Sequence, residues 1–181
     1  MVKYIAFLRG INISGKNKIT MSELRCGFEE IGYTNVSTYL NSGNVIFETD
    51  EERAELKSDI ECIISEKFGL NIPVYVIQTE ELGRILSCAP AWWATENKAK
   101  YDNLIFILTG ETAEEIADMI GETSEDLEQV QVFENVIFWT FDREAYRKCN
   151  WWKKTASAKI AEKLTIRTAG TVKKLCGLVE K

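Results

Sequence analysis

The chain has 181 residues, of which 28% are charged and none is histidine, and its formal net charge is −6. This length allows one domain or two small ones, and no apolar run approaches the ~20 residues of a membrane-spanning helix. The lack of histidine excludes Ser-His-Asp and Cys-His catalysis and histidine-ligated metals. We therefore expect a soluble protein with no metal, no cofactor and no membrane partner.

The first half of the chain predicts the order strand, helix, strand, strand, helix, strand. The expected strands span residues 2–9, 36–40, 44–48 and 72–77. The expected helices begin at capping boxes, residues 20–23 and 49–52, and end at Gly32 and Gly69. This order is the split, ferredoxin-like arrangement. In that arrangement the loop of residues 9–18 and the turn of residues 41–44 lie at the same end of the sheet.

The second half resembles the first. Residues 44–49 and 135–140 are identical at five of six positions, and each lies at the same place in a strand, helix and hairpin order. Matched order favours an internal duplication. We expect an α+β fold with two similar ferredoxin-like lobes, residues 1–79 and 102–181, joined by residues 80–101. The other expected elements are helices at 79–87, 112–120, 142–149, 157–164 and 171–179, and a strand at 165–168.

Cysteine usage and charge bear on the compartment and the partners. The five cysteines form no C-x-x-C pair, and the first residues predict a strand rather than a signal peptide, so we expect a reducing cytoplasm.

Residues 1–141 carry 11 basic and 24 acidic side chains, whereas residues 142–181 carry 11 and 4. This asymmetry favours complementarity between the halves over a basic face for an acidic partner.

The loop after the first strand has the composition of an anion site. Arg9, Lys16 and Lys18 bring three cations into ten residues without an acid, and Gly10 and Gly15 let the backbone turn. The spacing of the two glycines and Lys16 matches seven positions of a P-loop, but Asn17 replaces the magnesium-binding hydroxyl. The next helix also begins too late, at Thr20, and a hairpin follows it. A nucleoside triphosphatase is therefore disfavoured.

Polar side chains from both loops complete the predicted site. Asn12, Asn17, Ser42 and Asn44 can supply directional hydrogen bonds beside Gly43. The alternative is a structural loop, since asparagine tolerates left-handed backbone and caps turns. The predicted ligand-binding set from these two loops is Arg9, Gly10, Asn12, Gly15, Lys16, Asn17, Lys18, Ser42, Gly43 and Asn44.

Two further features have competing interpretations. The adjacent tryptophans at 92–93 and 151–152 suit base stacking, but packing is favoured because most aromatic surface is buried. Cys149 lies among basic residues that would lower its pKa, but an ordinary thiol is favoured because no base or motif accompanies it.

The motif residues resemble a known family. The strings Leu8-Arg9-Gly10-Ile11-Asn12, Gly15-Lys16-Asn17-Lys18 and Ser42-Gly43-Asn44-Val45 resemble the bacterial family called domain of unknown function 1697, with Ser14 replacing a usual glycine. The resemblance returns at Arg167, Thr171-Val172 and Lys174-Leu175, where Thr168-Ala169 replaces Asn-Trp. It implies a cytoplasmic bacterial α+β protein with two similar lobes, and it adds Arg167 to the predicted site.

We expect non-catalytic binding of a phosphate-bearing ligand, either a nucleic acid or a nucleotide, and assign no catalytic residue. One alternative is an enzyme acting on a phosphorylated small molecule, with Lys16 or Cys149 as the reactive group. Another is a protein-interaction scaffold that uses the tryptophan pairs. A homo-oligomer is compatible with all three.

Overall fold

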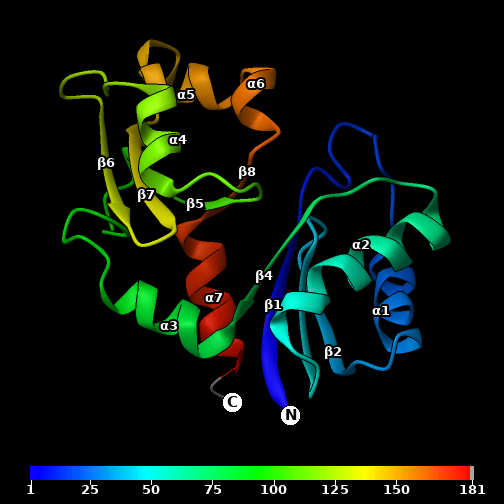
Figure 1. Ribbon diagram of the computed structural model, residues 1–181. Helices are drawn as coiled ribbons and strands as arrows, with labels where there is room; N and C mark the ends of the chain where they lie inside the picture. The colour runs from blue at the N-terminus through cyan, green and yellow to red at the C-terminus, as the bar shows by residue number, and fades with distance from the viewer. Residues whose placement is uncertain (180–181) are drawn as a thin grey trace. The chain divides into compact units, whose positions relative to one another are not determined.

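The computed structural model describes residues 1–179, and the last two residues of the predicted second lobe lie outside this range. The chain forms two compact units, residues 1–83 and residues from Arg84 onward (Figure 1). Helix α3 (Thr79–Ser87) contains the boundary between them. Within the described residues, every helix is too short or too polar to cross a bilayer.

The first unit has the predicted ferredoxin-like order. Its elements are β1 (Val2–Leu8), α1 (Met21–Glu30), β2 (Thr34–Tyr39), β3 (Asn44–Thr49), α2 (Arg53–Phe68) and β4 (Val74–Gln78). The strands form an antiparallel sheet in the order β2-β3-β1-β4, and α1 and α2 cover one face of it (Figure 1). Strand β1 is therefore central, and the loop that leaves it begins in the middle of one sheet end.

The core of the first unit follows from residue spacing. Leu56, Ile60 and Ile64 lie four residues apart on α2, so they share one face and are completely buried. From the sheet, Phe47 stacks on Tyr33 with ring centroids 4.6 Å apart. These apolar contacts fix the sheet and helices that hold the two loops.

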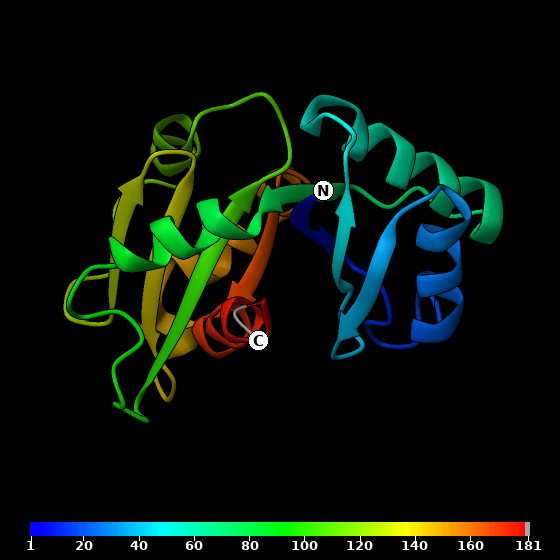
Figure 2. The same cartoon turned by 90° about the horizontal axis from the view of Figure 1, so that it is seen from below.

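The second unit repeats the sheet order and adds a helix at its C-terminal end. Its elements after α3 are β5 (Lys100–Ile107), α4 (Ala113–Ile120), β6 (Glu128–Phe133), β7 (Val136–Asp142), the 3-10 helix η1 (Tyr146–Lys148), α5 (Asn150–Thr155), α6 (Ala158–Ala161), β8 (Leu164–Thr168) and α7 (Ala169–Val179). The strand order is β6-β7-β5-β8, and α7 packs on β5 and β8 (Figure 2). The fold is thus α+β, with two ferredoxin-like lobes and an extra C-terminal helix.

The predicted second capping box is wrong. Helix α2 begins at Arg53, and its N-cap, Glu52, makes no side-chain capping bond. Thr49 still belongs to β3, where it pairs with Val2, and its hydroxyl accepts a hydrogen bond from the backbone N–H of Glu51. Because Thr49 is held in the sheet, the chain needs additional residues to turn before a helix begins.

The predicted helices at 142–149 and 157–164 are also wrong in extent. Asp142 ends β7, and its Oδ1 accepts hydrogen bonds from the backbone N–H groups of Glu144 and Ala145, so the chain turns there instead of entering a helix. Only η1 and α5 follow. The second helix is the single turn α6, because Leu164 is already paired with Ile107 in the sheet.

Both tryptophan pairs have one buried member, which confirms the packing interpretation. Trp93 is 6% exposed, and its indole N–H donates to the Asn103 carbonyl at 2.7 Å. Trp151 is 2% exposed, and its indole N–H donates to the Gly121 carbonyl at 2.8 Å. Their neighbours, Trp92 and Trp152, are partly buried.

Candidate functional site

The loop of residues 9–18 and the turn of residues 41–44 contact each other at one end of the first sheet. The Asn12 side-chain amide donates to the Asn41 carbonyl at 2.9 Å, and the Leu8 backbone N–H donates to the Gly43 carbonyl at 2.8 Å. The expected juxtaposition of the two loops is therefore confirmed. Residues 9–18 and 41–44 together are called the loop pair below.

Asn12 fixes the path of the longer loop. Its Oδ1 accepts from the Ile19 backbone N–H at 3.0 Å, and its Nδ2 donates to the Ile19 carbonyl at 2.8 Å. The residue adopts a φ of 54°, which asparagine tolerates better than most side chains. Asn17 closes the loop from the other side, because its Nδ2 donates to the Gly10 carbonyl at 3.0 Å. The longer loop is thus held by side-chain amides instead of regular secondary structure.

Gly43 is required by space as well as by conformation. Its φ is +79°, and a Cβ at this position would lie 2.7 Å from the Leu8 Cβ and 3.0 Å from the Ile11 Cδ1. Ile11 is 1% exposed, so the longer loop is also anchored in the core. Any larger residue at position 43 would separate the turn from the loop.

Asn44 supports the turn from inside. It is fully buried, and its Nδ2 donates to the Tyr39 carbonyl at 2.9 Å and to the Ser42 hydroxyl at 3.0 Å. Asn12 and Asn17 also bond the protein's own backbone through their side-chain amides. These internal hydrogen bonds build the loop pair, and the ligand-binding role of its residues stays a prediction.

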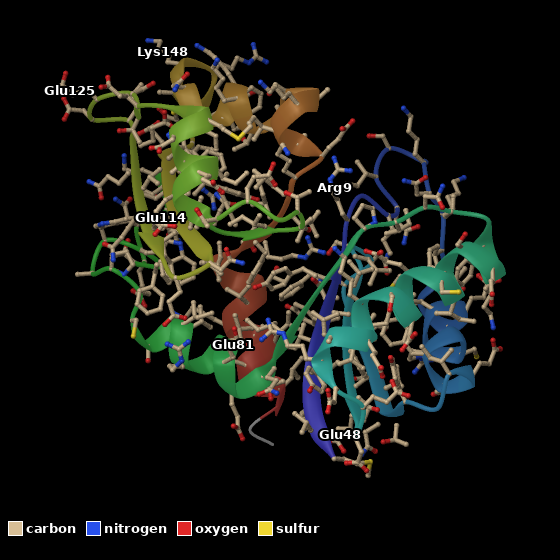
Figure 3. The ribbon with its side chains drawn as sticks, viewed as in Figure 1. Arg9, Glu48, Glu81, Glu114, Glu125 and Lys148 are labelled. Carbon is tan, nitrogen blue, oxygen red and sulfur yellow. The ribbon has the colours of Figure 1, made fainter. Side chains whose placement is uncertain are left out.

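Three cations accompany this scaffold. Lys16 and Lys18 are exposed, and neither forms an ion pair within residues 1–179. Arg9 is partly buried at the start of the loop, and its backbone N–H donates to the Pro73 carbonyl at 3.0 Å (Figure 3). A hydrogen-bonded loop therefore presents two exposed lysines that have no acidic partner among the described residues.

An open depression of about 840 Å³ lies beside the longer loop. Asn12, Gly15 and Lys18 line one part of it, and the first residues of α1 line the other. The Glu23 carboxylate is among these residues, and it accepts a hydrogen bond from the Thr20 hydroxyl at 2.6 Å. Because this acid already occupies the positive end of α1, the part near Lys18 is better suited to an anion.

Two exposed apolar side chains, one in the loop pair and one immediately before its turn, were not predicted from the sequence. Ile13 is 59% exposed and Leu40 is 54% exposed. Each interrupts a polar loop without the periodic partners of a core residue, which is the signal that could have revealed them. The surface around the lysines is thus partly apolar.

Arg167 belongs to the second unit, whereas the loop pair belongs to the first. Arg167 lies in β8 of the second unit, is 8% exposed, and donates to the Thr165 hydroxyl at 2.9 Å and the Ile166 carbonyl at 3.0 Å. Burial lowers the pKa of its guanidinium to about 10.

Cys149 is not an activated nucleophile. It is completely buried, and burial, followed by the negative charge of Glu128, raises the pKa of its thiol. The nearby basic residues do not outweigh these two effects. The ordinary-thiol interpretation is confirmed, and the enzyme alternative loses one of its two reactive groups.

Comparison with known proteins identifies the family. A family model described as "Protein of unknown function (DUF1697)" matches residues 1–138, so the chain belongs to this family. No curated protein matches the sequence. Among solved structures, the chain is similar to the conserved bacterial protein SP0830 from Streptococcus pneumoniae. The identity is 27%, the match covers 97% of each chain, and the TM-score is 0.85.

Proposed function

We propose that the loop pair binds a phosphate-bearing ligand, a nucleic acid or a nucleotide, without catalysing a reaction on it. The proposal rests mainly on Lys16 and Lys18, which are exposed, have no acidic partner in the described chain, and extend from a loop that Asn12 fixes. A hydrogen-bonded loop with unpaired cations suits phosphate, because its backbone loses little conformational freedom on binding.

Of these ligands, the surface favours a single-stranded nucleic acid. The depression beside Lys18 is open to solvent, and the exposed Ile13 and Leu40 offer apolar contact to base faces next to the cations. A nucleotide would use the same lysines but fewer of the apolar contacts.

We also propose that the two units arose by duplication, since their sheets share one strand order and helices α1 and α4 share one type of cap. Only the first unit then kept the basic loop.

Fluorescence anisotropy of labelled single-stranded RNA and DNA tests this function at low and physiological salt. The Lys16→Gln/Lys18→Gln variant should lose at least tenfold in affinity at low salt. Losing two phosphate contacts should lower the slope of log affinity against log salt by about 1.4. The matched control is Lys153→Gln/Lys154→Gln, which removes two exposed lysines of α5. An equal loss of affinity in both variants would mean that net charge alone explains the effect. If the original protein did not bind at low salt, nucleic acid would be removed from the proposal.

A further inference from the structure

The second unit contains a pocket of about 460 Å³ in which cations outnumber acids. It lies between the segment of residues 94–102, the start of α7, and Arg143. Four cations and two carboxylates line it: Lys98, Lys100, Arg143 and Lys173, with Glu96 and Asp102. This volume lies within the range of small-molecule sites. A local excess of positive charge here contrasts with the protein's net charge of −6.

The four cations form no ion pair within the described residues. Lys100 lies opposite Asp142 in the sheet, but the pKa of Asp142 is lowered mainly by backbone hydrogen bonds, and Lys100 contributes least. The pocket lining therefore keeps an excess of positive charge, although Glu96 and Asp102 offset part of it.

Arg143 is oriented before any ligand arrives. Its guanidinium carbon lies 4.7 Å from the centre of the Tyr101 ring, and its Nε donates to the Lys100 carbonyl at 2.9 Å. These contacts engage one face and one N–H of the guanidinium. Its two terminal nitrogens stay available for the paired hydrogen bonds that arginine makes with phosphate or carboxylate.

Asp102, which lines the pocket, and its sheet neighbour Thr140 each have an unpartnered polar atom among the described residues. Asp102 and Thr140 are directly paired on β5 and β7, so their side chains share one sheet face. The Asp102 Oδ1 and the Thr140 Oγ1 are both buried and have no hydrogen-bond partner among the described residues, and Thr140 as a whole is 3% exposed. Leaving such atoms unpaired costs roughly the desolvation of each group. Asp102 as a whole is only partly buried and lines the pocket, so a ligand contact is inferred from its place in the lining and not from the buried Oδ1.

We propose that this pocket binds a phosphorylated polyhydroxy small molecule, a sugar phosphate or the ribose phosphate of a nucleotide. Arg143 and the lysines hold the phosphate, and Asp102 accepts a hydrogen bond from a ligand hydroxyl. Neither group alone accounts for the lining, since the Asp102 carboxylate would repel a bare phosphate and a neutral sugar would leave the cations without a counter-charge.

Calorimetry on the full chain with ribose 5-phosphate, AMP, ribose and inorganic phosphate tests this proposal. Both phosphorylated ribose compounds should bind at least tenfold more tightly than ribose or inorganic phosphate. AMP binding without ribose 5-phosphate binding would require base contacts and overturn the proposed ligand class, as would equal affinity for inorganic phosphate. No binding by either compound would overturn the site.

Variants separate this pocket from the loop pair. Arg143→Gln/Lys173→Gln changes two exposed residues and should weaken ribose 5-phosphate binding at least tenfold, whereas Lys16→Gln/Lys18→Gln should leave it unchanged. The reverse result would assign the ligand to the loop pair and overturn the second site. Asp102→Ala should retain inorganic phosphate binding while reducing the preference for ribose 5-phosphate severalfold. An undiminished preference would exclude Asp102 as the hydroxyl acceptor.

Discussion

The connection between the first strand and the first helix is built differently in the two units, although their sheets share one order. Both helices begin with a capping box: Thr20 with Glu23 on α1, and Thr112 with Glu115 on α4. In the first unit, twelve residues separate β1 from α1, whereas five separate β5 from α4.

The two connections also carry opposite charges. The longer one presents Lys16 and Lys18, which have no ion-pair partner among the described residues. The shorter one presents Glu111, which pairs with Lys163 before β8. The comparison teaches that the shared fold fixes where a connection begins and ends, while the residues within the connection decide whether its charges are left exposed or balanced by an ion pair.

Gly43→Ala should produce the largest effect, because it breaks the contact between the two loops. The new Cβ would overlap the Leu8 Cβ and impose a left-handed conformation on alanine, which together cost about 2–4 kcal/mol of unfolding free energy. Urea unfolding measures this loss. Gly10→Ala is the matched control: its φ is +70° but nothing lies within 4 Å of its Cβ, so about 1 kcal/mol is expected. Equal losses would mean that backbone conformation alone selects glycine at position 43.

Asn12→Gly should loosen the longer loop while its lysines stay unchanged. Glycine accepts the φ of 54° but loses three hydrogen bonds to Ile19 and Asn41, so we expect a loss of about 1–2 kcal/mol. Amide hydrogen exchange should accelerate at Ile19. Affinity for single-stranded RNA should fall, because the loosened loop must become ordered on binding. Unchanged exchange would show that Ile11 alone anchors the loop.

Removing the two caps should have equal effects. Thr20→Ala and Thr112→Ala each delete one side-chain acceptor for a helix N–H, so each should cost about 1 kcal/mol in thermal or urea unfolding. Thr20→Ser and Thr112→Ser keep the hydroxyl and should restore most of the loss. A much larger effect at Thr20 would indicate that the longer connection depends on its cap in a way that the shorter one does not.

Glu111→Gln should give the smallest loss of stability of these variants, and the size of this loss should depend on pH. The hydrogen bond from Lys163, and then that from Thr109, lowers the pKa of Glu111 to about 2 in the folded protein. Because the folded pKa is below the unfolded value, the ionised carboxylate stabilises the protein above about pH 4.3 and this contribution disappears as pH falls toward 2. The urea midpoint of the variant should be lower at pH 7 and equal to that of the original protein near pH 2. If the difference in urea midpoint were the same at both pH values, the effect would come from packing and not from charge.

The sequence predicted the candidate site better in position than in chemistry. Asn12, Asn17 and Asn44 were recognised as belonging to one site, because topology places their loops at one sheet end. Their side chains bond the protein's own backbone, which residue type alone does not reveal, because an amide suits a turn and a ligand equally well. The unpartnered oxygen of Asp102 was likewise hidden, since it depends on which atoms surround β5.

Local pattern by itself determined most of the first unit and the position of α4, because alternation, helical spacing and capping boxes act over a few residues. It failed at Thr49 and Asp142, where pairing with a distant strand kept each residue in the sheet beyond the point that local signals indicated. It also could not show the burial that raises the pKa of the Cys149 thiol, which depends on residues far away in sequence. Those features required the tertiary structure, because desolvation and strand pairing are set by neighbours that only folding brings together.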